Sequence, residues 1–205
     1  MLVALTPEAV GAAPPSTRPS TLMLERRLLD AIVRGDERQA PQVYASLLPA
    51  VQTTLLRVLG SPDRQHRELT QRSIEQVIAD LVQHPSPWLC RLEVWATTSA
   101  ARVALDVLRD RMTQRDVEVS WGDAMARPLA PDAHVPAPGS AIDRLRWLLA
   151  ELPPQQAEAI VLCDVMGLEP GDVAVTSSVG VDQVRRRLAA GHERLARQME
   201  LETSS

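Results

Sequence analysis

Residues 152–188 read LPPQQAEAIVLCDVMGLEPGDVAVTSSVGVDQVRRRL, and this stretch decides how the C-terminal half folds. Breaks at Leu152-Pro153-Pro154 and at Gly167 separate three helical patterns, which cover about residues 155–165, 170–177 and 181–199. The last two patterns are joined by a short turn at residues 178–180. A short helix, a turn and a longer helix in this order predict a helix-turn-helix.

In a helix-turn-helix, the second helix enters the major groove and its early residues meet base edges and phosphates. Val184 and Leu188 are expected to face inward, so the candidate DNA contacts are the polar residues between and before them: Gln183, Arg185, Arg186 and Arg187. Three consecutive arginines span about 300° of a helix, at roughly 100° per residue, so they cannot all face one groove. A guanidinium suits guanine edges and phosphates equally, so the sequence leaves both kinds of contact open. The plain alternative is a solvated arginine patch.

The N-terminal half is also predicted to be helical, from the spacing of its apolar residues. Its apolar residues recur at helical spacing in stretches that stop at Gly35, at Gly60 and before His84-Pro85. Ser86 followed by Pro87 predicts the start of a longer helix that runs through Met112. No credible alternation of apolar and polar residues predicts a strand. We therefore expect an all-α protein, with a bundle of about four helices in this half.

Proline marks the expected domain boundaries. Eight of the 16 Pro residues fall within residues 1–21 and 116–141, where no helical period is sustained. The second stretch is too long for a structureless loop inside one compact domain, so it is expected to be a flexible linker. The predicted organisation is a disordered tail (1–21), a helical domain (22–115), the linker (116–141), a helix-turn-helix domain (142–200) and a second disordered tail (201–205).

Composition excludes several classes of protein. The 205 residues are 45% hydrophobic, 23% charged and only 2% aromatic, which favours helices packed through aliphatic side chains. No run approaches the ~18 apolar residues of a membrane span, so no membrane insertion is expected. All 22 basic residues are Arg, which excludes a Schiff-base lysine and a Walker A loop. The net charge of −4 means that any contact with nucleic acid depends on local arginine clusters.

Neither a metal nor a cofactor is expected. The two Cys, Cys90 and Cys163, lie far apart in apolar helical patterns, and the four His are scattered, so no ligand spacing appears. No nucleophile elbow or zinc-protease motif occurs, so no enzymatic activity is expected. The N-terminus has no basic region and no full apolar stretch, so it does not resemble a signal peptide. These features predict a cytoplasmic protein with reduced, buried thiols.

The helix-turn-helix stretch resembles region 4 of bacterial sigma factors of the extracytoplasmic-function (ECF) type, within the sigma-70 family. The resemblance rests on LPPQQ at 152–156, AIVLC at 159–163, Gly167-Leu168, DVA at 172–174 and VDQVRRRL at 181–188. It implies that Arg185 and Arg186 contact the distal promoter element and that Gln183 contacts the DNA backbone. The fold implied is two small helical domains joined by a flexible linker.

The N-terminal half is similar to region 2 of the same family. Glu68-Leu69-Thr70-Gln71 resembles the helix that docks on the clamp helices of the polymerase, which makes Glu68, Leu69 and Gln71 the expected polymerase contacts. Six residues follow the spacing of the stretch that melts the proximal promoter element: Trp95, Ala100, Arg102, Asp106, Leu108 and Arg109. The resemblance implies that Arg102 and Arg109 lie near DNA.

This resemblance implies a transcription initiation factor, with core RNA polymerase and promoter DNA as partners and an anti-sigma factor as a further one. Five positions depart from the family pattern. Arg72 replaces an acid, Arg102 an Asn, and Ser177 and Ser178 a buried Leu and a Gly. Gly180 replaces a Ser-type helix cap. Two alternatives therefore stay open: a degenerate sigma-like regulator without promoter recognition, and a free-standing helix-turn-helix repressor or activator.

The four tryptophans raise the question of base stacking, because exposed aromatic rings can hold unstacked bases. Trp88 and Trp95 are seven residues apart, which places them on one helical face and predicts that both lie in the core. Trp147 lies among leucines and is also expected in the core. Trp121 lies in the expected linker, where it could dock on a domain or on polymerase.

Overall fold

The computed structural model describes the backbone of residues 19–60, 65–125 and 141–203, and the side chains of residues 23–60, 65–114 and 141–201. Every regular element in these ranges is helical, which confirms the all-α prediction. The elements are α1 (Pro19–Arg34), η1 (Glu37–Gln39), α2 (Ala40–Leu59), α3 (His66–Gln83), η2 (Pro87–Leu89), α4 (Leu92–Met125), α5 (Ala141–Glu151), α6 (Pro154–Ile160), η3 (Val161–Val165), α7 (Pro170–Thr176) and α8 (Val181–Thr203).

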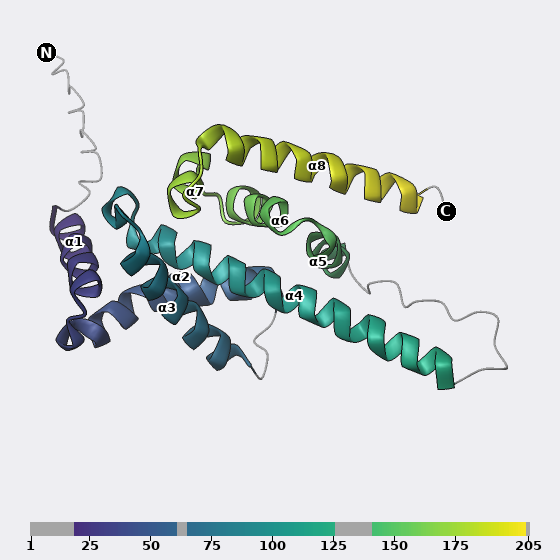
Figure 1. Ribbon diagram of the computed structural model, residues 1–205, viewed down its shortest axis with the longest axis horizontal. Coiled ribbons are helices and arrows are strands. Elements are labelled where there is room, and N and C mark those ends of the chain that lie inside the picture. The colour runs from purple at the N-terminus through teal and green to yellow at the C-terminus, as the bar shows by residue number, and fades with distance from the viewer. Residues whose placement is uncertain (1–18, 61–64, 126–140, 204–205) are drawn as a thin grey trace, which may run out of the picture.

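Helix α4 lies at the centre of the molecule (Figure 1). It packs against α2 and α3 on one side and against α5, α6 and α7 on the other. Its residues 94–101 are all buried, and most of them are small: Ala96, Thr97, Thr98, Ser99, Ala100 and Ala101. Small side chains allow neighbouring helices to approach on several sides at once. The buried apolar residues of both halves consequently form one continuous core.

Glycines end the first two long helices where the sequence predicts it. Gly35 follows α1 with φ +66°, and Gly60 follows α2 with φ +92°. Both values lie in the left-handed region, which glycine adopts at little cost because it has no Cβ. Helix α3 ends before His84-Pro85, as predicted, since a residue that precedes proline is disfavoured in the helical conformation.

The helix predicted from Ser86 to Met112 begins later than expected. Ser86 and Pro87 open only the single turn η2, and the backbone of Cys90 is then extended, with φ −125° and ψ 158°. Helix α4 begins at Leu92. The indole nitrogen of Trp95 donates a 3.0 Å hydrogen bond to the backbone oxygen of Pro87, which holds η2 against the start of α4.

The expected boundaries of the linker and the tails also differ from the observed helices. Helix α4 continues to Met125, ten residues into the predicted linker, because no proline interrupts the chain before Pro128. Helix α1 begins at Pro19, since proline is well suited to the first turn of a helix. Helix α8 continues to Thr203. The division into separate domains stays a prediction. Residues 126–140 lie outside the described part of the chain.

Arg146 of α5 connects the C-terminal half to the end of α2. Its Nε donates a 2.9 Å hydrogen bond to the backbone oxygen of Val58, one of the last carbonyls of that helix. Its Nη1 donates to the Asp143 carboxylate at 3.0 Å. The guanidinium lies where a Cβ of Gly60 would be, so any other residue at this position would displace the end of the Arg146 side chain. Among the described residues, no helix is both long and apolar enough to span a membrane.

Gly60→Ala is expected to destabilise the protein more than Gly35→Ala does. Both changes introduce a Cβ at positive φ, which costs about 1–2 kcal/mol. Only Gly60→Ala also displaces the Arg146 guanidinium, because no atom lies within 4 Å of a Cβ at Gly35. Losing that hydrogen bond adds about 1–2 kcal/mol. Urea unfolding of both variants measures the difference, and equal costs would contradict the contact between Arg146 and Gly60.

Candidate nucleic-acid interface

Helices α7 and α8 follow one another with a short turn between them, which is the order of elements that the sequence predicts. Backbone hydrogen bonds close the turn between them, including Val179 N to Ala174 O at 3.0 Å and Val184 N to Gly180 O at 3.2 Å. Val184 is 1% exposed and fixes the inward face of α8. Further along, Gly191 lies against Ile160 of α6, where a Cβ would approach the isoleucine side chain to 2.7 Å.

The candidate DNA contacts at the start of α8 point outward. Gln183, Arg185 and Arg186 are exposed, and Arg187 is half-buried. Arg185 donates from Nη1 to the Asp182 carboxylate at 3.3 Å, and both side chains are well exposed. An exposed ion pair of this kind contributes little to stability, so Arg185 can exchange Asp182 for another anion. Their contact with DNA stays a prediction.

Ser177 and Ser178, which depart from the family pattern, occupy the turn without leaving a buried hydroxyl unpaired. The Ser177 hydroxyl donates to Glu158 Oε1 at 3.1 Å and accepts from Arg102 Nη2 at 3.2 Å. Ser178 is exposed and has φ +52°, a left-handed conformation that costs a residue with a Cβ about 1–2 kcal/mol. The turn therefore keeps its geometry at some cost in stability.

Arg102 is partly buried, and its guanidinium is held by neighbouring carboxylates and hydroxyl or carbonyl oxygens. Its Nε donates to Glu158 Oε1 at 2.9 Å, its Nη1 to Asp80 Oδ2 at 3.4 Å, and its Nη2 to Thr176 O at 3.3 Å. Sequence reasoning did not identify Glu158 and Asp80 as partners, because they are 56 and 22 residues away from Arg102. In this conformation Arg102 is not free to contact DNA.

Arg109 is also partly enclosed. Its Nη1 donates to the Asp106 carboxylate at 3.2 Å, and its side chain is 24% exposed. Its Nε and Nη2 are buried and have no hydrogen-bond partner. Like Arg102, it lies on α4, whereas the exposed arginines of the helix-turn-helix lie on α8. The structure therefore does not place all the predicted DNA contacts on one open face.

The expected polymerase contacts lie on α3, but not all on its surface. Glu68 and Gln71 are exposed, and Gln71 donates to Glu75 Oε1 at 2.8 Å. Leu69 is 5% exposed and belongs to the core, so it supports the helix from beneath. The exposed face continues with Arg72 and Ile78. Docking of polymerase on this face stays a prediction.

The prediction that Trp88 lies in the core is wrong, because its side chain is 58% exposed. Trp88 belongs to η2 and the buried Trp95 to α4. Because no single helix contains both residues, their seven-residue spacing does not place them on the same face. Trp147 is 38% exposed, which also contradicts the expected burial. The extended backbone of Cys90 separates Trp88 from the helix that carries Trp95. The side chain of Trp121 lies outside the described residues.

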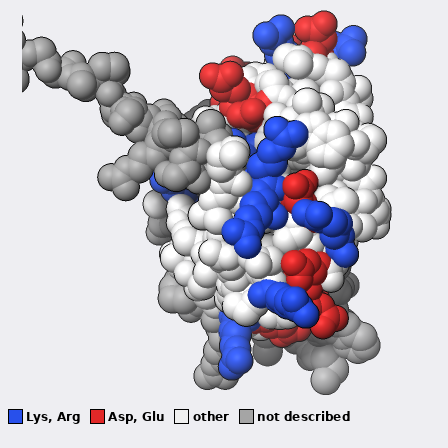
Figure 2. Space-filling model, turned by 90° about the vertical axis from the view of Figure 1, so that its left-hand side faces the viewer, with Lys and Arg blue, Asp and Glu red and all other residues white. Residues whose placement is uncertain are grey.

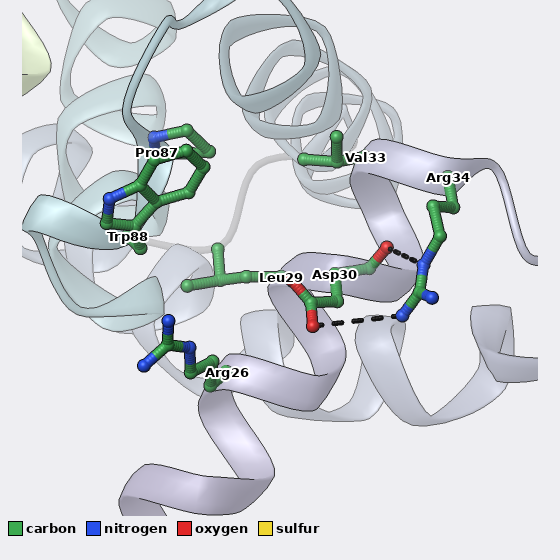
Figure 3. A pocket seen from close by; sticks show the side chains of 7 residues that line it. All are labelled: Arg26, Leu29, Asp30, Val33, Arg34, Pro87 and Trp88. Atoms are coloured by element: carbon green, nitrogen blue, oxygen red, sulfur yellow. Dashed lines mark hydrogen bonds and ion pairs between the residues drawn. The ribbon is translucent and has the colours of Figure 1, made fainter.

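Trp88 lines a groove between η2 and α1, with a volume of about 370 Å³. Figure 3 shows Pro87 and Trp88 facing Leu29 and Arg26 across this groove. Val33 and Arg34 lie along the same wall, and Arg34 is paired with Asp30 at 3.7 Å. An exposed indole beside arginine side chains is the combination that single-stranded nucleic acids bind, through stacking and phosphate contacts.

The charges on this side of the molecule are mixed. Figure 2 shows basic and acidic side chains interspersed on the side where α1 and α7 lie in Figure 1. Several arginines here pair with neighbouring carboxylates, such as Arg91 with Glu25 at 3.3 Å and with Glu93 at 3.2 Å. This arrangement creates no strong long-range attraction for DNA, in agreement with the net charge of −4.

The chain is similar to a sigma factor. A solved structure, "Co-crystal structure of the sigma factor RpoE in complex with the anti-sigma factor NepR from Bartonella quintana", aligns with 80% of this chain and 98% of its own, at 18% identity and a TM-score of 0.44. No protein-family model and no curated relative matches the sequence.

Both thiols are suited to structural roles. Burial first, and then the charge and hydrogen bond of Asp172, raise the pKa of Cys90 to about 11. Its Sγ lies 3.7 Å from Asp172 O and 3.8 Å from Asp172 Oδ1, across the contact between the two halves. Burial, followed by the Asp164 carboxylate, also raises the pKa of Cys163. Within the described residues, no three His, Cys, Asp or Glu side chains are grouped to hold a metal ion.

The raised pKa of Cys90 predicts that stability falls between pH 9 and about pH 11. The folded protein keeps the thiol protonated up to about pH 11, whereas the unfolded chain releases the proton near the ordinary thiol pKa of 9.0. Raising the pH through this window therefore favours unfolding, by roughly 1–2 kcal/mol. The chain has no Lys, so few other groups titrate there.

Urea unfolding of the parent and of Cys90→Ala at pH 8 and pH 10.5 measures this effect. Cys163 remains in both proteins, so its titration cancels in the comparison. We expect the loss of stability at high pH to be smaller in Cys90→Ala. An identical loss in the two proteins would contradict the raised pKa.

Proposed function

We propose that the chain is a sigma factor of the ECF type, which binds core RNA polymerase and directs it to specific promoters. The observation that carries this proposal is the helix-turn-helix of α7 and α8. Its second helix buries Val184 and exposes Gln183, Arg185 and Arg186 in its first two turns. A helix N-terminus with exposed arginines suits both base edges and phosphates in the major groove.

The exposed face of α3 is proposed to dock on the polymerase. Glu68, Gln71 and Arg72 lie on this face, over a core that includes Leu69. The low net charge supports a protein that reaches DNA as part of a larger complex, because long-range attraction of DNA then comes from the partner. An anti-sigma factor is a second proposed partner. No enzymatic step is needed for this function.

The groove beside Trp88 is proposed to hold an unstacked base of the opened proximal element. Trp88 offers a stacking surface, and Arg26 on the opposite wall offers a phosphate contact. Stacking of one base on an aromatic side chain contributes about 1–3 kcal/mol. This contribution requires single-stranded DNA, so it favours opening of the promoter rather than binding of the duplex.

A second candidate is a sigma-like regulator that binds polymerase without recognising promoters. The observation that favours it is Arg102, whose three nitrogens all donate within the protein. Transcription in vitro with core polymerase and a fragmented genomic library separates the two. Discrete starts that share two upstream elements support the sigma factor. Binding of polymerase without new starts supports the regulator.

Changing both Arg185 and Arg186 to Ala is expected to abolish transcription from the cognate promoter while polymerase binding stays unchanged. The matched control is Arg194→Ala with Arg197→Ala, which removes two exposed arginines further along α8. Loss of one phosphate or base contact costs about 1–3 kcal/mol, so the double change lowers promoter affinity at least about tenfold. Abortive transcription and polymerase pull-down are the two measurements. Equal effects of both pairs would contradict a specific role of the first two turns.

Trp88→Ala is expected to slow promoter opening without changing affinity for closed duplex promoter DNA. Trp147→Ala serves as the control, because it removes a second partly exposed indole that lies on α5, away from the groove. We expect Trp88→Phe to keep most of the activity, since a phenyl ring can also stack. Permanganate footprinting of the polymerase complex measures opening, and an unchanged footprint in Trp88→Ala would contradict the proposed stacking.

A further inference from the structure

The turn η2 is held at both ends by aromatic side chains. Residues 85–87 are Pro-Ser-Pro, and proline has no N–H, so Ser86 supplies the only backbone donor of this stretch. Its N–H donates to Nδ1 of His84 at 3.1 Å. The backbone oxygen of Pro87 accepts a 3.0 Å hydrogen bond from the indole nitrogen of Trp95. One ring thus bonds the donor of the turn, and another bonds its acceptor.

These two rings also contact each other. The centroids of the His84 and Trp95 rings lie 4.9 Å apart with an interplanar angle of 68°, which is an edge-on contact. Trp95 is 1% exposed, whereas His84 is half-buried at the end of α3. We call His84 and Trp95 the ring pair. Because the core holds Trp95, its contact keeps the imidazole in the orientation that points Nδ1 at Ser86.

The indole of Trp88 depends on this turn for its position, because burial does not hold it. Its side chain is 58% exposed, and that of Leu89 is 63% exposed. The 3.2 Å hydrogen bond from Leu89 N to Ser86 O lies within the turn and reaches no neighbouring element. The hydrogen bonds of the ring pair therefore fix the backbone around Trp88 relative to α3 and α4. Figure 3 shows where this places the indole beside α1.

The hydrogen bond from Ser86 requires a neutral imidazole. A backbone N–H can only donate, so Nδ1 of His84 must keep a lone pair to accept from it. A second proton on the ring would place an N–H at Nδ1, facing the N–H of Ser86, and the hydrogen bond would be lost. Histidine side chains change charge between pH 5 and 8. The ring is only half-buried, so a proton from solvent can reach it.

The charged groups around His84 are not bonded to its ring. Among the described residues, the imidazole contacts Ser86 and Trp95, and no carboxylate forms an ion pair with it. Asp80, one turn earlier on α3, is bonded to Ser99 and Arg102 instead. The response of the ring to a proton therefore acts through the hydrogen bond from Ser86. The charged side chains that line or border the groove beside the turn are Glu25, Arg26, Asp30, Arg34, Arg91 and Glu93.

We propose that His84 positions Trp88: its neutral imidazole, held in place by Trp95, fixes the turn that presents the indole to the groove, and protonation of the imidazole releases that turn. His84 is a positioning residue, because it acts through the backbone of Ser86. The inference rests on the proposed function, since it regulates the groove that is assigned there to an unstacked base. Acid then weakens stacking in the groove and slows promoter opening.

Two substitutions of His84 separate its acceptor from its ring. His84→Asn keeps an acceptor that does not titrate, because an asparagine side chain readily bonds the backbone N–H two residues further on. His84→Phe keeps a ring against Trp95 but has no acceptor. Circular dichroism verifies that both variants keep their helices.

Amide hydrogen exchange of Ser86 in these two variants measures the contact itself. The amide should exchange about threefold to tenfold faster in His84→Phe than in His84→Asn at pH 8, which corresponds to the loss of one hydrogen bond. Equal exchange in the two variants would overturn the proposal, because the acceptor at position 84 would then not hold the turn.

Fluorine NMR of the full chain labelled with fluorotryptophan measures the position of Trp88. The chain has four Trp residues, and Trp88→Phe identifies the signal of Trp88. Between pH 8 and pH 5 we expect this signal to shift in the parent, whereas it should stay in place in His84→Asn and in His84→Phe. The three other His residues are present in all of these proteins, so their effect is common to them. A signal that does not shift in the parent, or that shifts equally in His84→Asn, would overturn the proposal.

Promoter opening measures the functional consequence. Lowering the pH from 8 to 6 should slow opening by the parent at least about threefold more than opening by His84→Asn, with the same polymerase and promoter in both reactions. The comparison removes the pH dependence of the polymerase itself. An equal loss, in a protein whose Trp88→Ala variant opens promoters slowly, would overturn the proposal. Failure of the proposed stacking is a separate result, because it appears as unchanged opening by Trp88→Ala at a single pH.

Discussion

The rest of the structure depends on one constraint, which is that α4 is covered by helices on both sides. A helix in this position must have small side chains where its neighbours approach, and residues 96–101 of α4 are Ala, Thr or Ser. The hydroxyls among them need partners, which Thr98 finds in Thr176 and Ser99 in Asp80. The second half is thus positioned by α4, and so is the helix-turn-helix that it carries.

Local signals allowed much of this fold to be predicted. Gly35, Gly60 and Gly167 end helical stretches because each adopts positive φ, and that preference belongs to the residue itself. The helix-turn-helix was predictable for the same reason, since a turn between two helical patterns is encoded within about thirty residues. Helix α4 runs ten residues into the stretch predicted as a linker, because proline-rich composition was averaged over residues 116–141 and the first proline of that stretch is Pro128.

The contacts between distant residues could not be predicted, and they decide the candidate site. Arg102 has the charge and spacing of a DNA contact, and only the fold reveals that Glu158 lies 2.9 Å from its Nε. Trp88 was assigned to the core from its spacing to Trp95, which holds only if one helix carries both. The extended backbone of Cys90 breaks that helix, so the same spacing places Trp88 on the surface. The spacing of two residues in the sequence predicts a shared face only when both residues belong to the same helix or strand.

The arginines of this chain differ mainly in what already binds them. Arg102 is held by two carboxylates in a partly buried contact, and one of them, Glu158, comes from the second half of the protein. Arg185 shares its charge with an exposed Asp182, and this pair exchanges easily because water solvates both partners. Whether an arginine can exchange its partner for another anion therefore depends on how buried its guanidinium is and on which carboxylates bind it. By this criterion, Arg185 at the start of α8 is open to a competing anion, whereas Arg102 on α4 is held by its partners.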